Sequence, residues 1–418
     1  MKPVTIAIAG CGSRGMNCYA RMHRQFEGRM KIVAAADLIA QKRQKMQDEY
    51  GVSPEMCFET AEEMLSREKL ADVVLVATPD RAHFGHASAA LRRGYHLLLE
   101  KPISLTEEEC LGIQQLAHEY DRHVVVCHVL RYAPFYQQVK QIMDSGEIGE
   151  IVNIQATEGV AYWHQAHSYV RGNWRRKCDS SPMILAKCCH DMDLFLWLTG
   201  RHCKSVSSVG SLRHFKADNA PEGAPLRCTD GCPAADSCPY NAVRFYLGGV
   251  DSGKKDWPIN VLAVEPTHDS ILDALKNGPY GRCVYHCDND VVDHQIVNLE
   301  MEDELTVSFT MTGFSAINGR RINVMGTHGE IRGDMDENII RVMPFAKEAY
   351  TIDVKTISND FSGHGGGDAR LMDDFLRLVS GEGTLGGALT SIDRSVESHL
   401  VALAAEKSRM EGGKLIRL

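Results

Sequence analysis

The sequence predicts an α/β protein of two domains, a doubly wound parallel sheet followed by a second α/β domain. Over residues 1–128, apolar runs of strand length alternate with segments of helical pattern. A glycine-rich turn follows the first apolar run. The chain also has 418 residues, more than one ordinary core holds. We therefore predict a first domain over 1–128 and a second over 129–418.

The first predicted strand, residues 4–9, leads into a glycine-rich turn and then a helical segment over 16–26. The turn reads Gly10-Cys11-Gly12-Ser13-Arg14-Gly15. Gly10 permits the tight turn, Gly12 lets backbone N–H groups approach a pyrophosphate, and Gly15 lets helix and strand pack closely. The phosphates would lie at the helix N-terminus, which favours negative charge. This context predicts a dinucleotide-binding Rossmann domain. The alternative is a glycine-bearing turn in another α/β domain.

The second predicted strand, residues 31–36, ends at Asp37. A carboxylate there can accept hydrogen bonds from both ribose hydroxyls and would repel a 2′-phosphate. The sequence therefore predicts NAD rather than NADP as the cofactor.

Polar residues follow two later strands of this domain. Further strands are predicted at 72–77, 95–99 and 123–128, and helices at 38–50, 60–67, 81–93 and 105–119. Ligands of open parallel sheets bind beyond the carboxyl ends of the strands. The predicted cofactor contacts are therefore the turn residues Gly10, Gly12, Ser13, Arg14 and Gly15, together with Asp37, Thr78, Pro79, His83, Glu100 and Lys101.

Lys101 is the first candidate catalytic residue. It lies at a strand end between Glu100 and Pro102, whose ring favours an extended backbone at Lys101. Partial burial beside a cofactor could lower a lysine pKa enough for acid–base work. The alternative is a surface lysine paired with Glu100.

The glycine turn, Asp37, Ala77-Thr78-Pro79-x-x-x-His83 and Glu100-Lys101-Pro102 together resemble the Gfo/Idh/MocA family, the glucose–fructose oxidoreductase and inositol dehydrogenase group. The resemblance covers essentially the whole chain. It implies an N-terminal Rossmann domain and a C-terminal α/β domain with a large, mostly antiparallel sheet. It also implies that Lys101 helps to bind or activate the reacting substrate hydroxyl.

The second domain opens with a crossover and a loop of aromatic and basic residues. Arg131 follows the last strand of the first domain, as in the family, and a helix over 134–144 and a strand over 148–158 come next. Aromatic faces beside hydrogen-bonding groups suit a sugar ring. We predict substrate contacts for Arg131, Tyr169, Arg171 and Trp174, with packing alone as the alternative for the loop.

A helical pattern over 184–200 carries Lys187, His190 and Asp193 at spacings that place them on one face. His190 and Asp193 match the family pattern, whereas Ala186 stands where the family often has a catalytic aspartate. An imidazole suits removal of an alcohol proton near neutral pH. We therefore predict His190 as the proton acceptor, with Lys187 or Asp193 tuning or relaying the proton. A structural histidine is the alternative.

Residues 203–260 are irregular, and they contain too few apolar residues to predict a self-supporting insert. Cys228, Cys232 and Cys238 could ligate a structural Zn(II), with a fourth ligand from Cys203, Cys283 or Cys287. The spacing is not that of standard zinc knuckles, and reduced cysteines are the alternative.

The remainder reads as a β meander over 281–343 and helices over 368–380 and 390–410 that pack back on the first domain. The polar loop from His364 to Asp368 is expected to be flexible and could border the site. One face of the sheet lacks helices to cover it. Family members use that face for association, so the resemblance implies a homodimer or homotetramer.

Composition excludes several classes of protein. The formal net charge of −9 argues against nucleic-acid binding, and no apolar stretch reaches the length of a membrane span. The fourteen cysteines are not expected to form a disulfide framework in a chain of this size without a secretory signal, and a cytoplasmic location is expected.

The prediction is an NAD-dependent oxidoreductase acting on a secondary hydroxyl of a carbohydrate, that is, a sugar, polyol or glycoside. One alternative is an NAD-dependent glycosidase that oxidises, eliminates and reduces again. Another is a dinucleotide-binding regulator without catalysis.

Overall fold

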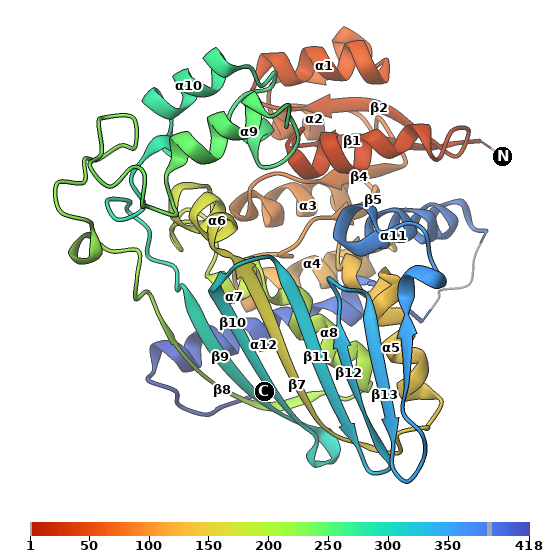
Figure 1. Ribbon diagram of the computed structural model, residues 1–418. Helices are drawn as coiled ribbons and strands as arrows, with labels where there is room; N and C mark the ends of the chain where they lie inside the picture. The colour runs from red at the N-terminus through yellow and green to blue at the C-terminus, as the bar shows by residue number, and fades with distance from the viewer. Residues whose placement is uncertain (1, 383–386) are drawn as a thin grey trace.

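The computed structural model describes residues 2–382 and 387–418. They form two sheets, one in the upper and one in the lower part of the molecule in Figure 1. The first sheet has six parallel strands in the order β3-β2-β1-β4-β5-β6. These strands are β1 (Val4–Ala9), β2 (Met30–Ala36), β3 (Cys57–Phe58), β4 (Val73–Val76), β5 (His96–Leu99) and β6 (Val124–Val126). All were expected except the two-residue β3.

Both faces of this sheet are covered, so its strands are apolar throughout. Ala7 and Ala9 of β1 pack in one cluster with α2 (Ala61–Ser66), α3 (His83–Arg92) and α4 (Glu107–Glu119). The alternate residues Ile6 and Ile8 pack on the other side, with the helical segment after the glycine turn and with α11 (Ser362–Ser380).

Local signals at the helix ends agree with these boundaries. Thr106 caps α4 by accepting a hydrogen bond of 3.2 Å from the Glu109 N–H, and three glutamates fill the first turn. Thr60 caps α2 in the same way. The remaining helix of this domain, α1 (Ala40–Tyr50), ends at Gly51, whose φ of 67° is left-handed.

The second sheet has nine strands in the order β14-β13-β12-β11-β7-β10-β9-β8-β15 and is antiparallel except where β7 pairs with β10. Its strands are β7 (Ile151–Ala161), β8 (Cys203–Ser211), β9 (His294–Met301), β10 (Thr306–Ser315), β11 (Gly319–Gly326), β12 (Gly329–Asp334), β13 (Ile339–Pro344), β14 (Tyr350–Asp353) and β15 (Ile416–Arg417). The α/β fold class with a large, mostly antiparallel second sheet is confirmed.

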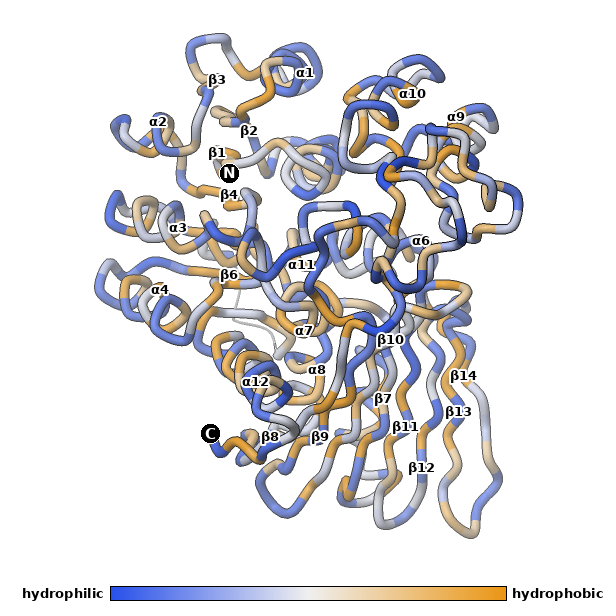
Figure 2. The backbone as a smooth tube through the Cα atoms, turned by 90° about the vertical axis from the view of Figure 1, so that its left-hand side faces the viewer, coloured by the Kyte–Doolittle hydropathy of each residue, from blue (hydrophilic) through white to orange (hydrophobic). Residues whose placement is uncertain are grey.

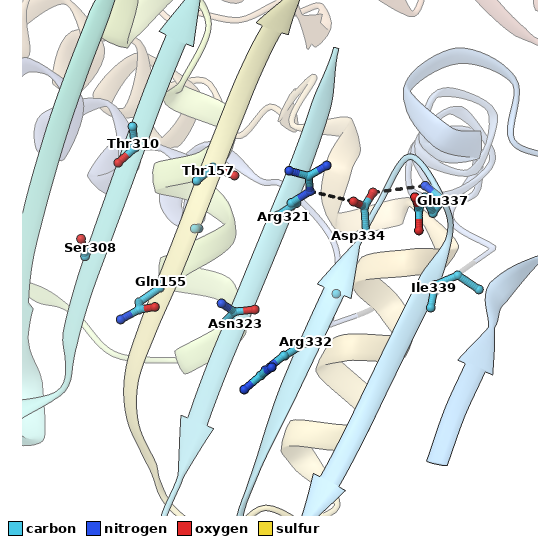
Figure 3. Close-up of a pocket in the computed structure, with 12 residues that line it drawn as sticks. Gln155, Thr157, Ser308, Thr310, Arg321, Asn323, Arg332, Asp334, Glu337 and Ile339 are labelled. Atoms are coloured by element: carbon cyan, nitrogen blue, oxygen red, sulfur yellow. Dashed lines mark hydrogen bonds and ion pairs between the residues drawn. The ribbon is translucent and has the colours of Figure 1, made fainter. Parts of the chain in front are cut away.

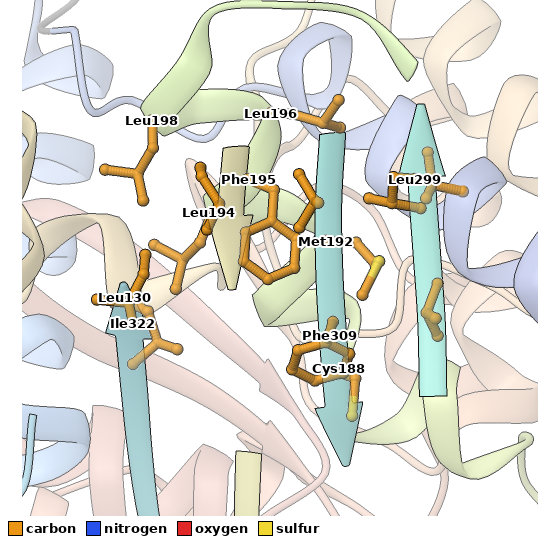
Figure 4. Packing of buried hydrophobic residues seen from close by; sticks show 14 of the residues in the cluster. Leu130, Cys188, Met192, Leu194, Phe195, Leu196, Leu198, Leu299, Phe309 and Ile322 are labelled. Carbon is orange, nitrogen blue, oxygen red and sulfur yellow. The ribbon is translucent and has the colours of Figure 1, made fainter. Parts of the chain in front are cut away.

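Helices cover one face of this sheet, and the other face lacks them (Figure 1). The covering helices are α5 (Pro134–Asp144), α8 (Cys189–Thr199) and α12 (Ile392–Met410). Phe195 of α8 meets Phe309 of β10 with ring centroids 5.7 Å apart in the core of this layer (Figure 4). Along β9 buried and exposed residues alternate, and the same alternation of hydropathy is visible on the neighbouring strands (Figure 2).

The irregular segment begins later than expected and supports itself better. Residues 203–211 are strand β8, so the insert runs from about 212 to 293. It contains α9 (Gly248–Asp251) and α10 (His268–Asn277), and the latter begins with a capping box formed by Thr267 and Ser270. Buried Tyr246, Ile271 and Leu275 form a small apolar cluster inside it. The expectation of too little apolar content was wrong because these side chains lie far apart in sequence.

The C-terminal helices return to the first domain. Thr390 accepts a hydrogen bond of 2.8 Å from the Val126 N–H, and Ile392 and Val396 of α12 pack in the cluster that contains α4. The two sheets therefore share helices from the end of the chain. Within the described residues, no helix is long and apolar enough to cross a membrane.

Candidate active site

The glycine turn has the shape that a dinucleotide requires. Gly10 has a φ of +95°, and a Cβ there would lie 2.5 Å from the Ala77 carbonyl oxygen. A Cβ at Gly15 would lie 1.9 Å from the carbonyl oxygen of Gly10. At Gly12 nothing lies within 4 Å of such an atom, and Ser13 beside it is exposed. Gly10 and Gly15 thus allow close packing of the backbone, whereas Gly12 leaves open space for phosphate groups.

Asp37 is held beside this turn at the end of β2. Its Oδ2 accepts a hydrogen bond of 2.9 Å from the Cys11 N–H, and its Oδ1 accepts one of 2.9 Å from the Ile39 N–H. The ammonium of Lys42 lies 3.6 Å from Oδ2. Each carboxylate oxygen keeps a second lone pair, so Asp37 can still receive ribose hydroxyls.

Arg14 joins the turn to two other parts of the chain. Its Nε lies 2.6 Å from Glu100 Oε1, and its Nη2 lies 2.7 Å from Oδ1 of Asp368, which follows the loop that opens α11. Burial alone would raise the pKa of Asp368, but the charges of Arg14 and His364 outweigh it and lower this pKa far below its usual range. Contacts of Arg14 and Glu100 with the cofactor stay predictions.

His83 braces the two strand ends that the sequence singled out. Its Nε2 lies 2.8 Å from the Thr78 carbonyl oxygen, and its Nδ1 lies 2.7 Å from that of Pro102. Pro79 is exposed between them, and Thr78 Oγ1 lies 2.9 Å from His86 Nδ1. His83 is 1% exposed, so its imidazole is buried and connects the two strand ends. A contact of His83 with the cofactor stays a prediction.

The structure brings Lys101 and His190 together. Lys101 Nζ donates a hydrogen bond of 2.7 Å to the main-chain oxygen of Ala186, four residues before His190. Burial, and then the charges of Lys101 and His364, lower the pKa of His190 well below its ordinary value. The imidazole is 4% exposed, and its Nδ1 has no hydrogen-bond partner within the described residues. A neutral, unpartnered ring nitrogen is able to accept a proton.

Lys187 does not share a helical face with His190, because the predicted helix is broken. It divides into α7 (Met183–Ala186) and α8, with Lys187 and Cys188 between them. Lys187 Nζ instead lies 3.1 Å from Oε1 of buried Glu158 on β7. Arg320 of β11 binds the other oxygen of Glu158 at 2.9 Å and extends this chain of charges into the second sheet.

Asp193 and Arg131 form a buried ion pair behind His190. Arg131 Nε and Nη2 donate to the two carboxylate oxygens at 2.6 and 2.5 Å, and His128 Nδ1 lies 2.6 Å from Oδ1. Burial would raise the pKa of Asp193, but Arg131 and His128 outweigh it and lower this pKa to about 2. With its guanidinium committed to Asp193, Arg131 holds the site from behind, and substrate contact stays a prediction.

The aromatic loop divides between the two domains. Trp174 Nε1 donates to Asp80 Oδ2 at 3.1 Å, which ties the loop to the end of β4. Arg171 donates to the main-chain oxygens of Arg282 and Tyr240, both at 2.7 Å, and so anchors the insert. Tyr169 is buried, with its ring centroid 6.3 Å from that of Trp174. Substrate contact stays a prediction for all three predicted loop residues.

The zinc site predicted at Cys228, Cys232 and Cys238 is not supported. Among the described residues, the one group of three possible ligands with donor atoms all within 4.8 Å is a different set: His128, Cys189 and His399. His399 is already engaged, because its Nε2 accepts from the Ile103 N–H at 2.8 Å and its Nδ1 lies 3.1 Å from the Ser395 oxygen. Near Cys228 the Arg171 guanidinium lies 3.8 Å from Sγ.

His364 lies in the loop that was expected to be flexible and able to border the site, although no role was predicted for the residue itself. Its ring centroid lies 5.8 Å from that of His190, and its Nδ1 lies 3.1 Å from Asp368 Oδ2. The loop is packed: Gly366 and Gly367 are buried, and a Cβ on Gly367 would lie 2.1 Å from the Val129 oxygen. The run of glycines was the available signal, since it permits the left-handed backbone found here.

Comparison with known proteins agrees with this geometry. Residues 4–128 match the family described as "Oxidoreductase family, NAD-binding Rossmann fold". Residues 136–238 match the "GFO/IDH/MocA C-terminal domain". The chain is 23% identical over 388 residues to the putative oxidoreductase YteT of Bacillus subtilis, covering 88% of this chain and 87% of that protein.

Two further similarities concern inositol dehydrogenases. The inositol 2-dehydrogenase of Salmonella paratyphi B is 26% identical over 200 residues, which are 48% of this chain and 55% of that protein. An inositol dehydrogenase homologue from Azotobacter vinelandii, solved with NAD⁺, has the same fold, with a TM-score of 0.70, 16% identity, and coverage of 100% of this chain and 98% of that one. The matches of both domains show that this chain belongs to the Gfo/Idh/MocA oxidoreductase family, whose first domain is an NAD-binding Rossmann fold.

Proposed function

We propose that this protein transfers hydride between NAD and a secondary hydroxyl carbon of a sugar, polyol or glycoside. The observation that carries the proposal is the meeting of Lys101 and His190 at the carboxyl edge of the parallel sheet, next to the glycine turn. The named activity of the inositol 2-dehydrogenase relatives supports a polyhydroxylated substrate.

In this proposal the amine of Lys101 and the imidazole of His190 have separate roles in the reaction. Lys101, held by the Ala186 carbonyl, donates a hydrogen bond to the substrate oxygen and favours the negative charge that develops there. His190 takes the hydroxyl proton through a free ring nitrogen. The C–H and O–H bonds break as the C=O bond forms. A nicotinamide held by the glycine turn would supply the acceptor for the hydride and its electron pair, and the proton would leave through the protein.

The remaining predicted residues act on these two groups. Asp193 and Arg131 hold the helix that carries His190. Lys187, bound to Glu158, orders the break between α7 and α8 where Lys101 finds its acceptor. In this proposal Tyr169, Arg171 and Trp174 shape the substrate side through the aromatic loop and the insert.

NAD is proposed over NADP because Asp37 ends β2 beside the open space at Gly12. A carboxylate at this point receives two ribose hydroxyls and repels a phosphate on one of them. Ser13, Thr78 and Pro79 are proposed to line the path from the phosphates to the nicotinamide.

The function is tested by NADH fluorescence after mixing the purified protein with NAD and a panel of polyols, sugars and methyl glycosides. NADH formation with at least one member is expected. Aryl glycosides without added NAD are the second arm, and aglycone release without net NADH would replace the dehydrogenase proposal with the glycosidase. Protein that binds neither NADH nor NADPH would refute both.

We further propose that the open face of the nine-stranded sheet associates with a second copy of the chain. The face carries two hollows of about 530 and 420 Å³, the larger lined by polar side chains that include Gln155, Asn323 and Arg332 (Figure 3). Exposed Val152, Val209 and Ile296 add apolar surface on β7, β8 and β9. A dimer or tetramer by light scattering is expected, and a monomer at micromolar concentration would contradict it.

A further inference from the structure

His364 occupies a backbone conformation that few side chains adopt. Its φ of 43° and ψ of 45° are left-handed, and Gly363, Gly365 and Gly366 around it also have positive φ. A non-glycine residue in this region costs on the order of 1–3 kcal/mol unless its surroundings hold it there, and such residues cluster at functional sites. The backbone at His364 therefore carries a conformational cost that a glycine would avoid.

The surroundings hold the imidazole in a defined orientation. Asp368, one turn further along α11, lies 3.1 Å from His364 Nδ1 and is itself fixed by Arg14 through hydrogen bonds of 2.7 and 3.2 Å. An Nδ1–H donated to a carboxylate leaves Nε2 as the nitrogen able to exchange a proton. Arg14 belongs to the glycine turn, so the cofactor site and this histidine share one hydrogen-bond network.

The ring faces His190. The two centroids are 5.8 Å apart with an angle of 49° between the planes, a distance that one water molecule or a substrate hydroxyl is able to bridge. The exposures differ: His190 is 4% exposed, whereas the His364 side chain is 36% exposed. His190 is therefore shielded from bulk water, whereas the neighbouring His364 side chain reaches the solvent.

Because His190 is buried, a proton that it accepts has to pass to a neighbouring group before it reaches solvent. The groups that face it are Lys101 from the end of β5, His128 after β6, His364 and Arg320, and none of these four is a carboxylate. Ala186 accepts a hydrogen bond from Lys101 through its main-chain oxygen, and its methyl side chain cannot accept a proton. A proton taken by His190 is thus poorly retained and has no carboxylate among these neighbours to receive it.

We propose that His364, oriented by Asp368, is a second acid–base residue that passes the substrate proton between His190 and solvent. The step rests on the proposed function. The hydroxyl proton moves to His190, then through the bridging water to His364 Nε2, and then to bulk water. No electrons move in this relay, because the hydride has already left with its electron pair for the nicotinamide.

The test uses the full-length protein, NAD and the panel alcohol that the wild type oxidises fastest. His364→Asn keeps a polar residue that tolerates the left-handed backbone but cannot transfer protons. His364→Gly relieves the backbone and leaves space for added imidazole. Both variants are expected to lose about 100-fold in kcat with an NADH affinity within about twofold of wild type. Imidazole in solution is expected to restore activity to His364→Gly.

His294 supplies the matched control. Its Nδ1 lies 2.8 Å from Asp293 Oδ1 and its side chain is 40% exposed, so it forms a similar pair in the second sheet outside the site. His294→Asn is expected to leave kcat unchanged. The pH profile of kcat should lose its acidic limb in His364→Asn, an effect that a purely structural role would not produce.

The outcomes separate the relay from the proposed function. A wild type that oxidises no panel member with either cofactor overturns both. An active wild type with variants within about threefold of its kcat overturns the relay alone. Loss of NADH affinity in parallel with kcat, or failure of imidazole to rescue His364→Gly, also overturns it, since His364 would then act by holding Arg14 and the glycine turn.

Discussion

The ammonium of Lys101 donates a hydrogen bond of 2.7 Å to the main-chain oxygen of Ala186, joining the end of β5 to the break between α7 and α8. A carbonyl fixes the position of the amine without cancelling its charge. The remaining N–H groups stay available for a substrate oxygen. The acceptor therefore comes from the backbone of Ala186, whose side chain carries no hydrogen-bonding group.

Lys101→Met should abolish most of the turnover while sparing the fold. Methionine fills similar space but donates no hydrogen bond, so kcat is expected to fall about 1,000-fold. NADH titrations should change little, because the glycine turn is untouched. Lys140→Met is the control, since Lys140 forms an exposed pair with Asp144 on α5. A kcat for Lys101→Met within about tenfold of wild type would remove Lys101 from the mechanism.

Asp37→Asn should shift the choice of cofactor. The amide loses the charge that strengthens hydrogen bonds to the ribose and the repulsion of a 2′-phosphate, so the Kd for NADH is expected to rise about tenfold and that for NADPH to fall. Fluorescence titration with both nucleotides measures the two shifts. Asp48→Asn serves as control because Asp48 is exposed and accepts a hydrogen bond from exposed Gln44 on the surface of α1. An unchanged ratio of the two Kd values would contradict the assignment of NAD.

Asp193→Asn should destabilise the protein in a pH-dependent manner. The folded pKa of Asp193, about 2, lies below its ordinary value of 3.8, so its contribution to stability is present above about pH 4 and is lost as the pH falls towards 2. Leaving Arg131 buried without its partner should cost about 4 kcal/mol at neutral pH. Urea unfolding of wild type and variant between pH 7 and pH 2 is the measurement.

The difference between the two proteins should shrink as the pH approaches 2. A difference independent of pH would mean that Asp193 acts through packing rather than charge. Asp144→Asn, which alters an exposed pair, is expected to change the free energy of unfolding by less than about 1 kcal/mol.

Arg171→Lys should loosen the insert. The carbonyls of Arg282 and Tyr240 would lose their guanidinium donor, at a cost of about 1–3 kcal/mol for buried groups left unpaired. Limited proteolysis within residues 212–293 should become faster, with Arg176→Lys as an exposed control. A raised KM with no change in proteolysis would instead favour direct contact of Arg171 with the substrate.

The first domain was predictable because its signals are local. The apolar runs, the glycine turn and Asp37 each depend on neighbouring residues, and β1, β2, β4, β5 and β6 appear where expected. The helix over 184–200 was less predictable. Its periodicity continues through Lys187, but α7 ends at Ala186, and the Lys187 side chain pairs with buried Glu158 on a distant strand.

The site could be predicted only in part for the same reason. Lys101 and His190 stand in recognisable motifs, and the structure brings them together. His364 stands in a glycine run with no such motif, and only the long-range contact between Asp368 and Arg14 shows what it faces. The insert's apolar cluster likewise depends on residues that the sequence separates by some thirty positions.

The pairing of Arg14 with Asp368 spans 354 positions of the chain. During synthesis the arginine leaves the ribosome first, and its carboxylate partner follows only 354 residues later. A truncated product can form the first parallel strands, but it lacks the group that orients this guanidinium. Chains that end before Asp368 should therefore be unable to hold Arg14 in the orientation found in the folded protein.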